Sequence, residues 1–85
     1  MARYRALFRK SVEKDFSSIP KRDVKKNLNR IKTLEENPRP PGSEKLTGQE
    51  RYRLRHGRYR IVYSIQDDEF TIWVVKIGHR KVIYR

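Results

Sequence analysis

The chain has 85 residues and a formal net charge of +12 at pH 7, from 22 Lys and Arg against 10 Asp and Glu. This length supports one domain over residues 1–85, and the absence of cysteine excludes thiolate catalysis and zinc–thiolate sites. Small secreted domains usually depend on disulfides, so a reducing, cytoplasmic location is expected, with no signal peptide and no membrane contact. The positive charge is spread over both halves of the chain and predicts a polyanionic partner.

The first elements in the chain are a predicted strand and a short helix. Residues 3–8 are expected to form the strand. Val12 and Phe16 lie four residues apart and can therefore share one face of a helix. Ser11 is the expected N-cap of this helix, because its hydroxyl can accept a hydrogen bond from a free backbone N–H.

A second helix is expected to begin at Pro20, which suits a first helical turn, and to end near Asn37, before a proline-rich connector over residues 38–50. Its apolar residues recur at helical spacing, and the predicted buried stripe is Val24, Leu28, Ile31 and Leu34. The two helices form a helical hairpin that must bury its apolar faces against another layer.

The second half of the chain predicts an antiparallel meander. Four strands are expected over residues 51–55, 58–65, 70–77 and 79–85, joined by short turns. Trp73 lies among aliphatic residues of the third of these strands and is expected in the core. The fold class is α+β, with the N-terminal strand and helical hairpin packed on one face of a twisted antiparallel sheet of about four to five strands.

The strongest functional signal is a run of arginines without any acidic residue, namely Arg51, Arg53, Arg55, Arg58 and Arg60. If the helices cover the sheet face that bears Tyr59 and Ile61, alternation places Arg53, Arg55 and Arg60 on the opposite face. Guanidinium groups suit phosphate because they stay charged and donate two hydrogen bonds at once. The alternative is a solvated strand face that protects a sheet edge from aggregation.

Two residues near the C-terminus are further candidates. His79 could transfer protons, because an imidazole titrates near neutral pH, and Tyr84 could stack on an unpaired base. A lone histidine at a strand end is more often structural, and Tyr84 could equally be a core or rim aromatic. The sequence contains no recognisable metal site, so a ribonuclease of this composition would use no metal and would rely on the RNA 2′-hydroxyl as nucleophile.

Four segments resemble the RelE/ParE family of bacterial toxins, together with the preceding strand, helices and linker: KLTG (45–48), RYRLR (51–55), GRYRIVYSI (57–65) and IGHRKVIYR (77–85). The resemblance implies a RelE-like fold similar to microbial RNases. It implies a toxin of a type II toxin–antitoxin system that cleaves mRNA on the ribosome, with 16S rRNA contacts and no cofactor. It also implies a cognate antitoxin, and operator DNA binding only through the antitoxin complex.

The resemblance assigns roles to single residues. Arg53 and Arg55 match two basic residues that contact substrate phosphates, and Arg60 matches the arginine that stabilises the transition state. Arg80 matches the residue at the leaving group, and Tyr84 the tyrosine that stacks on a base. The wider RNA-binding set is expected to include Arg51, Arg58 and Lys81.

The general base stays open at this point. Arg55 stands where the family pattern has a basic lysine, and arginine hardly deprotonates. A lowered pKa of Arg55, His79 in its place, or electrostatic catalysis without a dedicated base are the options. Two other functions also stay open: a ParE-like inhibitor of DNA gyrase, and an RNA-binding module without activity.

Overall fold

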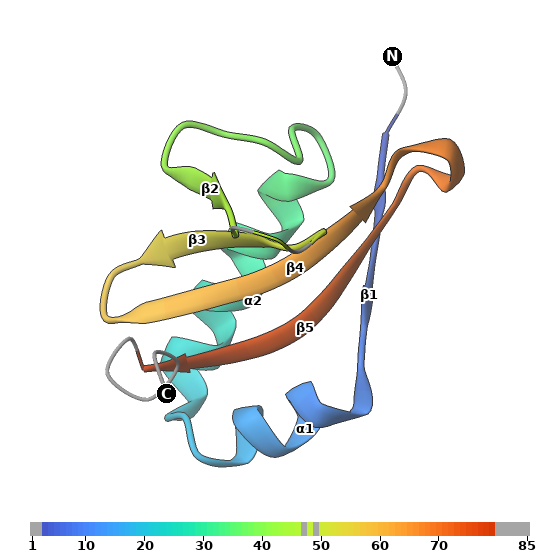
Figure 1. Cartoon of the computed structure of the whole chain (residues 1–85). Helices are drawn as coiled ribbons and strands as arrows, with labels where there is room; N and C mark the ends of the chain where they lie inside the picture. The colour runs from blue at the N-terminus through green and yellow to red at the C-terminus, as the bar shows by residue number, and fades with distance from the viewer. Residues whose placement is uncertain (1–2, 47, 49, 80–85) are drawn as a thin grey trace.

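The computed structural model describes residues 3–46, 48 and 50–79. They form a five-stranded sheet with two α-helices on one of its faces (Figure 1). In chain order the elements are β1 (Arg5–Phe8), α1 (Lys10–Ser17), α2 (Lys21–Leu34), β2 (Ser43–Lys45), β3 (Tyr52–His56), β4 (Tyr59–Gln66), a 3₁₀ turn (Asp67–Glu69) and β5 (Thr71–His79). None of these helices has the length and apolar character needed to cross a membrane.

The sheet is mixed, which corrects the prediction of a purely antiparallel sheet. Its strand order is β1-β5-β4-β3-β2, and β1 runs parallel to β5 with Arg5 opposite Thr71. The other pairs are antiparallel because short turns or a short connector join consecutive strands. The N-terminal strand therefore forms an edge of the sheet and does not pack on its face.

Helix α1 begins one residue earlier than its predicted cap. Arg9 occupies the N-cap position, and Ser11 lies within the first turn. The Ser11 hydroxyl donates a hydrogen bond of 3.0 Å to the carbonyl oxygen of Val75 in β5. Asp15 Oδ2 accepts a hydrogen bond of 3.0 Å from the backbone N–H of Ile77. Helix α1 thus satisfies backbone groups along the part of β5 that β1 does not reach.

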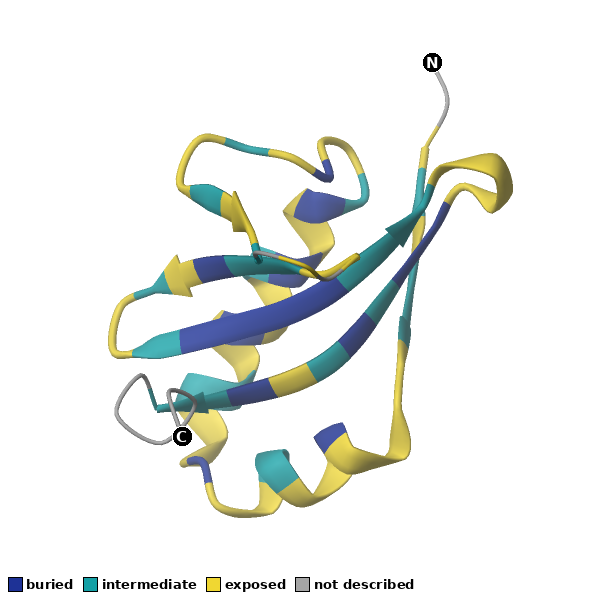
Figure 2. Ribbon diagram, in the orientation of Figure 1, coloured by how far each residue is buried: buried dark blue, intermediate teal, exposed yellow. Residues whose placement is uncertain are grey.

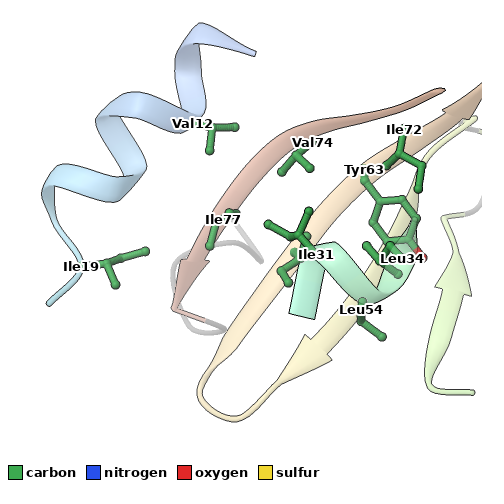
Figure 3. Packing of buried hydrophobic residues seen from close by; sticks show 10 residues of the cluster. Val12, Ile19, Ile31, Leu34, Leu54, Tyr63, Ile72, Val74 and Ile77 are labelled. Atoms are coloured by element: carbon green, nitrogen blue, oxygen red, sulfur yellow. The ribbon is translucent and has the colours of Figure 1, made fainter. Parts of the chain in front are cut away.

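The core lies between the helices and the sheet. Figure 3 shows Val12, Ile19, Ile31 and Leu34 of the helical layer facing side chains of β3, β4 and β5. The sheet contributes Leu54, Ile61, Tyr63, Ile72, Val74 and Ile77, all nearly inaccessible to solvent. As predicted from alternation, Leu54 of β3 and Ile61 and Tyr63 of β4 belong to the core cluster with the helices, whereas Val62 is buried outside that cluster. Figure 2 shows that the middle of β4 is buried along its length.

One residue of the predicted α2 stripe is wrong. Leu28 is 38% exposed, whereas Asn27 is completely buried. The helix therefore presents Val24, Asn27, Ile31 and Leu34 to the interior, at spacings of three, four and three. Both registers satisfy helical periodicity, so the apolar pattern alone selected the wrong neighbour.

Trp73 lies outside the core, contrary to prediction. Strand β5 shifts register between its contacts with Val62 and Tyr63, and Trp73 pairs with Ser64 on the face away from the helices. Its ring is covered by Arg9, whose guanidinium carbon lies 4.3 Å from the ring centroid. This cation–π contact gives the aromatic ring a partner that sequence spacing did not reveal.

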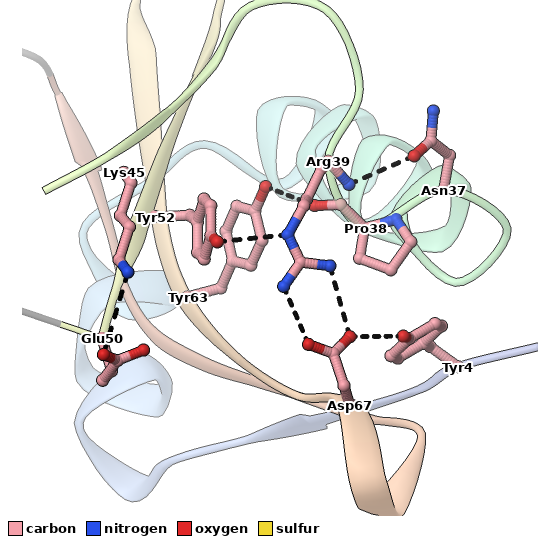
Figure 4. Close-up of polar contacts among 9 residues, drawn as sticks. All are labelled: Tyr4, Asn37, Pro38, Arg39, Lys45, Glu50, Tyr52, Tyr63 and Asp67. Atoms are coloured by element: carbon pink, nitrogen blue, oxygen red, sulfur yellow. Dashed lines mark hydrogen bonds and ion pairs between the residues drawn. The ribbon is translucent and has the colours of Figure 1, made fainter.

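A polar cluster fastens the connector after α2 to the rest of the fold (Figure 4). Arg39 makes two hydrogen bonds to Asp67, at 2.9 and 3.2 Å, and a third of 3.1 Å to the hydroxyl of Tyr52. The Tyr4 hydroxyl donates to the same Asp67 carboxylate. The Tyr63 hydroxyl donates to the Pro38 carbonyl at 2.8 Å, and burial raises the pKa of Tyr63 to about 12.

Asp67→Asn is expected to lower the midpoint of urea unfolding at about pH 7 and to weaken the loss of stability in acid. Hydrogen bonds from Arg39 and Tyr4 lower the pKa of Asp67 in the folded protein. The stabilisation is therefore present above the unfolded-state pKa of about 3.9 and disappears as the pH falls through the folded-state value. Urea titrations at about pH 7 and about pH 3 measure this. Asp68→Asn is the control, because Asp68 lies in the same 3₁₀ turn but is not the partner of Arg39 and Tyr4; equal effects of the two substitutions would contradict the prediction.

Candidate nucleic-acid interface

A cavity of about 270 Å³ opens on the sheet face that the helices leave uncovered. Its lining residues come from the connector and strands β2, β3 and β4: Gly42, Glu44, Arg53, Arg55 and Arg60. We call it the arginine cavity. Three of the five arginines predicted over residues 51–60 therefore lie around one space.

Strand register explains why these residues meet. Arg53 and Arg55 are two apart in β3 and so point to the same face, away from buried Leu54. Arg60 of β4 lies directly opposite Arg55, and Glu44 of β2 lies directly opposite Arg53. Directly opposite side chains on neighbouring strands are in contact range, so three strands deliver one compact charged group.

Arg60 is the most buried member of the group, with only 5% of its surface exposed. Its other cross-strand neighbour, in β5, is Gly78, which has no side chain and leaves room for the Arg60 stem. A buried guanidinium has already given up most of its freedom before any ligand arrives. Arg55, in contrast, is exposed, so the cavity combines a buried arginine with an exposed one.

Glu44 is the site residue that sequence reasoning missed. Its Oε2 lies 2.7 Å from Nη2 of Arg53, and this hydrogen bond, with the further positive charges of Arg60 and Arg55, lowers the pKa of Glu44. The carboxylate is therefore ionised at neutral pH, and it already occupies part of the space beside the arginines in which an anion would lie. The signal that could have revealed it is weak: one acid in a three-residue strand, whose register with β3 is not visible in the sequence.

Gly42 shapes the wall of the cavity that the connector provides. Its φ of +95° is a left-handed conformation that side-chain-bearing residues rarely adopt. The chain needs this turn to leave Pro40 and Pro41 and enter β2, where Glu44 faces Arg53.

The structure does not bring the remaining predicted residues to this cavity. Arg51 is exposed just before β3 and does not line it. Arg58 lines a different cavity, next to α2. His79 pairs with Tyr59 on the helix-facing side of the sheet, and the two rings meet edge to face at 6.2 Å between centroids. The arginine cavity opens on the other face of the sheet, so the position of His79 disfavours proton transfer there.

The predicted residues Arg80, Lys81 and Tyr84, and with them the expected last strand over residues 79–85, lie outside the described residues except for His79. Strand β5 itself continues through Gly78 to His79, where a bend was expected. Among the residues that the structure describes, no group of three or more His, Asp or Glu could hold a metal ion.

The arginine cavity has the chemistry of a phosphate site. Its guanidinium groups are permanent cations with paired N–H donors, which match the oxygens of a phosphodiester. Glu44 is the only lining residue that can accept a proton near neutral pH. A site with cations to hold a phosphate and one carboxylate beside them can bind a polynucleotide and take a proton from it.

The architecture is shared with toxins solved in complex with their antitoxins. A chain of the archaeal RelE–RelB complex from Pyrococcus horikoshii OT3 matches with a TM-score of 0.76 at 31% identity, over 94% of this chain and 97% of that one. A chain of the RelB–RelE antitoxin–toxin complex from Methanococcus jannaschii matches with a TM-score of 0.71 at 29% identity, over 92% and 94%. The fold is therefore that of a RelE-like toxin.

Sequence relatives agree with the fold. A Methanocaldococcus jannaschii protein described as toxin RelE1 is 34% identical over 80 residues, covering 89% of each chain. An Escherichia coli protein described as RelE-like is 30% identical over 82 residues, covering 93% of this chain and 85% of that one. Residues 3–84 match the family described as the ParE toxin of type II toxin–antitoxin system, parDE. The chain belongs to the RelE/ParE family of toxins of type II toxin–antitoxin systems, as its motifs predicted.

Proposed function

We propose that this toxin is an endoribonuclease that cleaves mRNA on the ribosome without a metal and is held inactive by a cognate antitoxin. The observation that carries the proposal is the arginine cavity, in which Arg53, Arg55 and Arg60 surround one space beside the carboxylate of Glu44. The named partner of the similar archaeal RelE chains supports an antitoxin of the RelB type.

In the proposed reaction RNA supplies its own nucleophile. Glu44 takes the proton of a 2′-hydroxyl, and the 2′-oxygen attacks the adjacent phosphorus. The bond from phosphorus to the 5′-oxygen breaks, which gives a 2′,3′-cyclic phosphate and a 5′-hydroxyl that has taken up one proton. The family resemblance alone places Arg80 at this leaving 5′-oxygen, either to stabilise it or to protonate it.

The proposed roles of the three arginines differ according to how far each is buried. Arg60 is held in place, so its guanidinium can stabilise the charge that develops on the phosphoryl oxygens without having to reorganise. Arg55, which is exposed, and Arg53 bind and orient the phosphates. We favour Glu44 as the general base over the options left open by the sequence, because it lines the cavity, is ionised and can accept a proton.

Substrate binding is expected to make Glu44 a better base. In the free protein the pKa of Glu44 is lowered, first by its hydrogen bond to Arg53 and then by the charges of Arg60 and Arg55. A bound phosphate competes for Arg53 and offsets part of that positive charge. The pKa of Glu44 then rises toward the working pH, where a general base is most effective.

Expression of the toxin without its antitoxin is expected to arrest growth and to yield mRNA cut on ribosomes, with 5′-hydroxyl ends. The measurement is mapping of RNA ends in arrested cells and on purified programmed ribosomes incubated with the protein. Arrest with intact message and damaged DNA would assign the toxin to gyrase. RNA binding without arrest or cleavage would leave only a binding module.

A further inference from the structure

A second and larger cavity, of about 480 Å³, lies between α2 and the β3–β4 turn, on the helix-facing side of the sheet. We call it the turn cavity. Three cations line it: Arg22 and Lys26 of α2, four residues apart and therefore on one face of the helix, and Arg58 of the turn. The proposed chemistry at the arginine cavity uses none of them.

The wall of the turn cavity contains a buried hydrogen-bond acceptor that has no donor among the described residues. Asn27 is completely buried, and its Nδ2 donates to the Asp23 carbonyl at 2.9 Å. Its Oδ1 accepts no hydrogen bond from any residue that the structure describes. A buried polar atom in this state costs stability, so a ligand that brings a hydroxyl or N–H donor would remove the cost.

The charge balance of the turn cavity favours an anion. One carboxylate, Asp23, lines it, and its Oδ2 accepts a hydrogen bond of 2.8 Å from the Tyr59 hydroxyl. Three cations against this single acid leave a positive excess. Burial, followed by the charges of Arg30 and Lys26, lowers the pKa of His56, which also lines the cavity and is therefore mostly neutral near pH 7.

The arginine cavity and the turn cavity lie on opposite faces of the same hairpin. Arg55 and Arg60 form one cross-strand pair, and the next pair toward the turn, His56 and Tyr59, points to the other face. Arg58 stands at the turn between them. An RNA strand that leaves the arginine cavity and passes around this turn therefore meets further cations.

We propose that the turn cavity is a second binding site for the backbone of the RNA held at the arginine cavity, with Arg22, Lys26 and Arg58 on a phosphate and Asn27 Oδ1 on a ribose or base donor. The proposal rests on the proposed function for the identity of the polyanion. Nucleic acid is favoured over an acidic peptide because the cations continue from the face proposed to bind phosphate.

The test measures the salt dependence of binding to a short, non-cleavable 2′-O-methyl RNA. Each cation that neutralises a phosphate of a single strand contributes about 0.7 to the slope of log K against log salt, so Lys26→Gln with Arg58→Gln is expected to reduce the slope by about 1.4. Lys10→Gln with Lys14→Gln removes the same charge from exposed positions of α1 and is the matched control. Equal slopes for the two double variants would overturn the proposal.

Asn27→Leu provides a second variant with a different signature. It removes a neutral acceptor, so RNA binding is expected to weaken several-fold while the salt slope stays unchanged. The melting temperature of the free protein is expected to stay the same or rise, because an unsatisfied buried oxygen disappears. Unchanged RNA affinity in a folded Asn27→Leu protein would remove the role assigned to this side chain.

The imidazole NMR signals of His56 report on the turn cavity directly. The ionisable or charged groups facing it are Arg22, Asp23, Lys26, Arg30, Arg58 and Tyr59. Bound RNA phosphate is expected to raise the pKa of His56, because it offsets the neighbouring cations. If a polyglutamate peptide raises the pKa of His56 and RNA does not, the cavity binds an acidic protein segment and the proposal fails.

The test of the turn-cavity site is independent of the test of mRNA cleavage. A toxin that cleaves mRNA but shows no slope change in Lys26→Gln with Arg58→Gln keeps its proposed function and loses the turn-cavity site. A toxin that never cleaves mRNA, yet shows the slope change and the His56 shift, keeps the site and loses the nuclease assignment.

Discussion

Replacing Arg60 with alanine is expected to reduce ribosome-dependent cleavage by about 10²–10³-fold, the loss typical of removing one fixed stabiliser of a transition state. The effect should fall on kcat more than on KM, because Arg53 and Arg55, the proposed phosphate-binding residues, stay in the cavity. Single-turnover cleavage of message on programmed ribosomes measures it. Arg60→Lys is expected to recover part of the activity, since it keeps the charge but not the paired donors.

Folding must be separated from catalysis in this experiment, because Arg60 is buried. Arg60→Met keeps most of the aliphatic stem, and its urea midpoint shows whether the hairpin survives. Arg5→Gln removes one exposed arginine from the opposite end of the sheet and is the matched charge control. Near-normal cleavage by folded Arg60→Ala would show that the reaction takes place elsewhere.

Replacing Glu44 with glutamine is expected to separate binding from cleavage. The loss of a general base reduces the rate by about 10²–10⁴-fold. RNA binding should become tighter, and the salt slope steeper by about 0.7, because Arg53 no longer shares its guanidinium with a carboxylate. A filter-binding titration and single-turnover cleavage, measured over a range of pH, report the two effects.

The pH profile identifies the role of Glu44. In the wild type, cleavage should fall in acid as the carboxylate is protonated, and this acid limb should be absent from Glu44→Gln. Glu50→Gln is the control, because Glu50 is exposed and pairs only at 3.8 Å with Lys45. If cleavage persists or improves in Glu44→Gln, Glu44 is only a counter-ion of Arg53. Electrostatic catalysis without a dedicated base would then be favoured.

The arginine face was predictable because strand alternation is a local property. Residues 51–65 repeat with period two, and buried Leu54 and Ile61 suffice to direct Arg53, Arg55 and Arg60 to the other side. Only the register between strands then decides which arginines meet. The turn formed by Gly57 and Arg58 sets that register and pairs Arg55 with Arg60. The strand bounds predicted from the sequence are one residue off here, because they leave His56 and Gly57 as the turn and would pair Arg55 with Arg58.

The errors occur where tertiary contacts override local patterns. Leu28 and Asn27 are neighbours on α2, and the sheet beneath selects the polar one, which no hydropathy pattern indicates. The register shift in β5 turns Trp73 outward and leaves Ile77 inward, and His79 then follows Ile77 to the helix side. Glu44 belongs to a strand too short to be recognised before its partner is known.

The pairing of β1 with β5 joins the first strand of the chain to the last one that the structure describes. A growing polypeptide therefore completes β1, both helices and the arginine hairpin before the neighbour of β1 exists, and contacts this distant in sequence form late. A chain that stops short of β5 leaves α1 without Val75 and Ile77, the strand residues its side chains hydrogen-bond. A chain truncated before β5 therefore lacks both the hydrogen-bonding neighbour of β1 and the strand on which α1 packs.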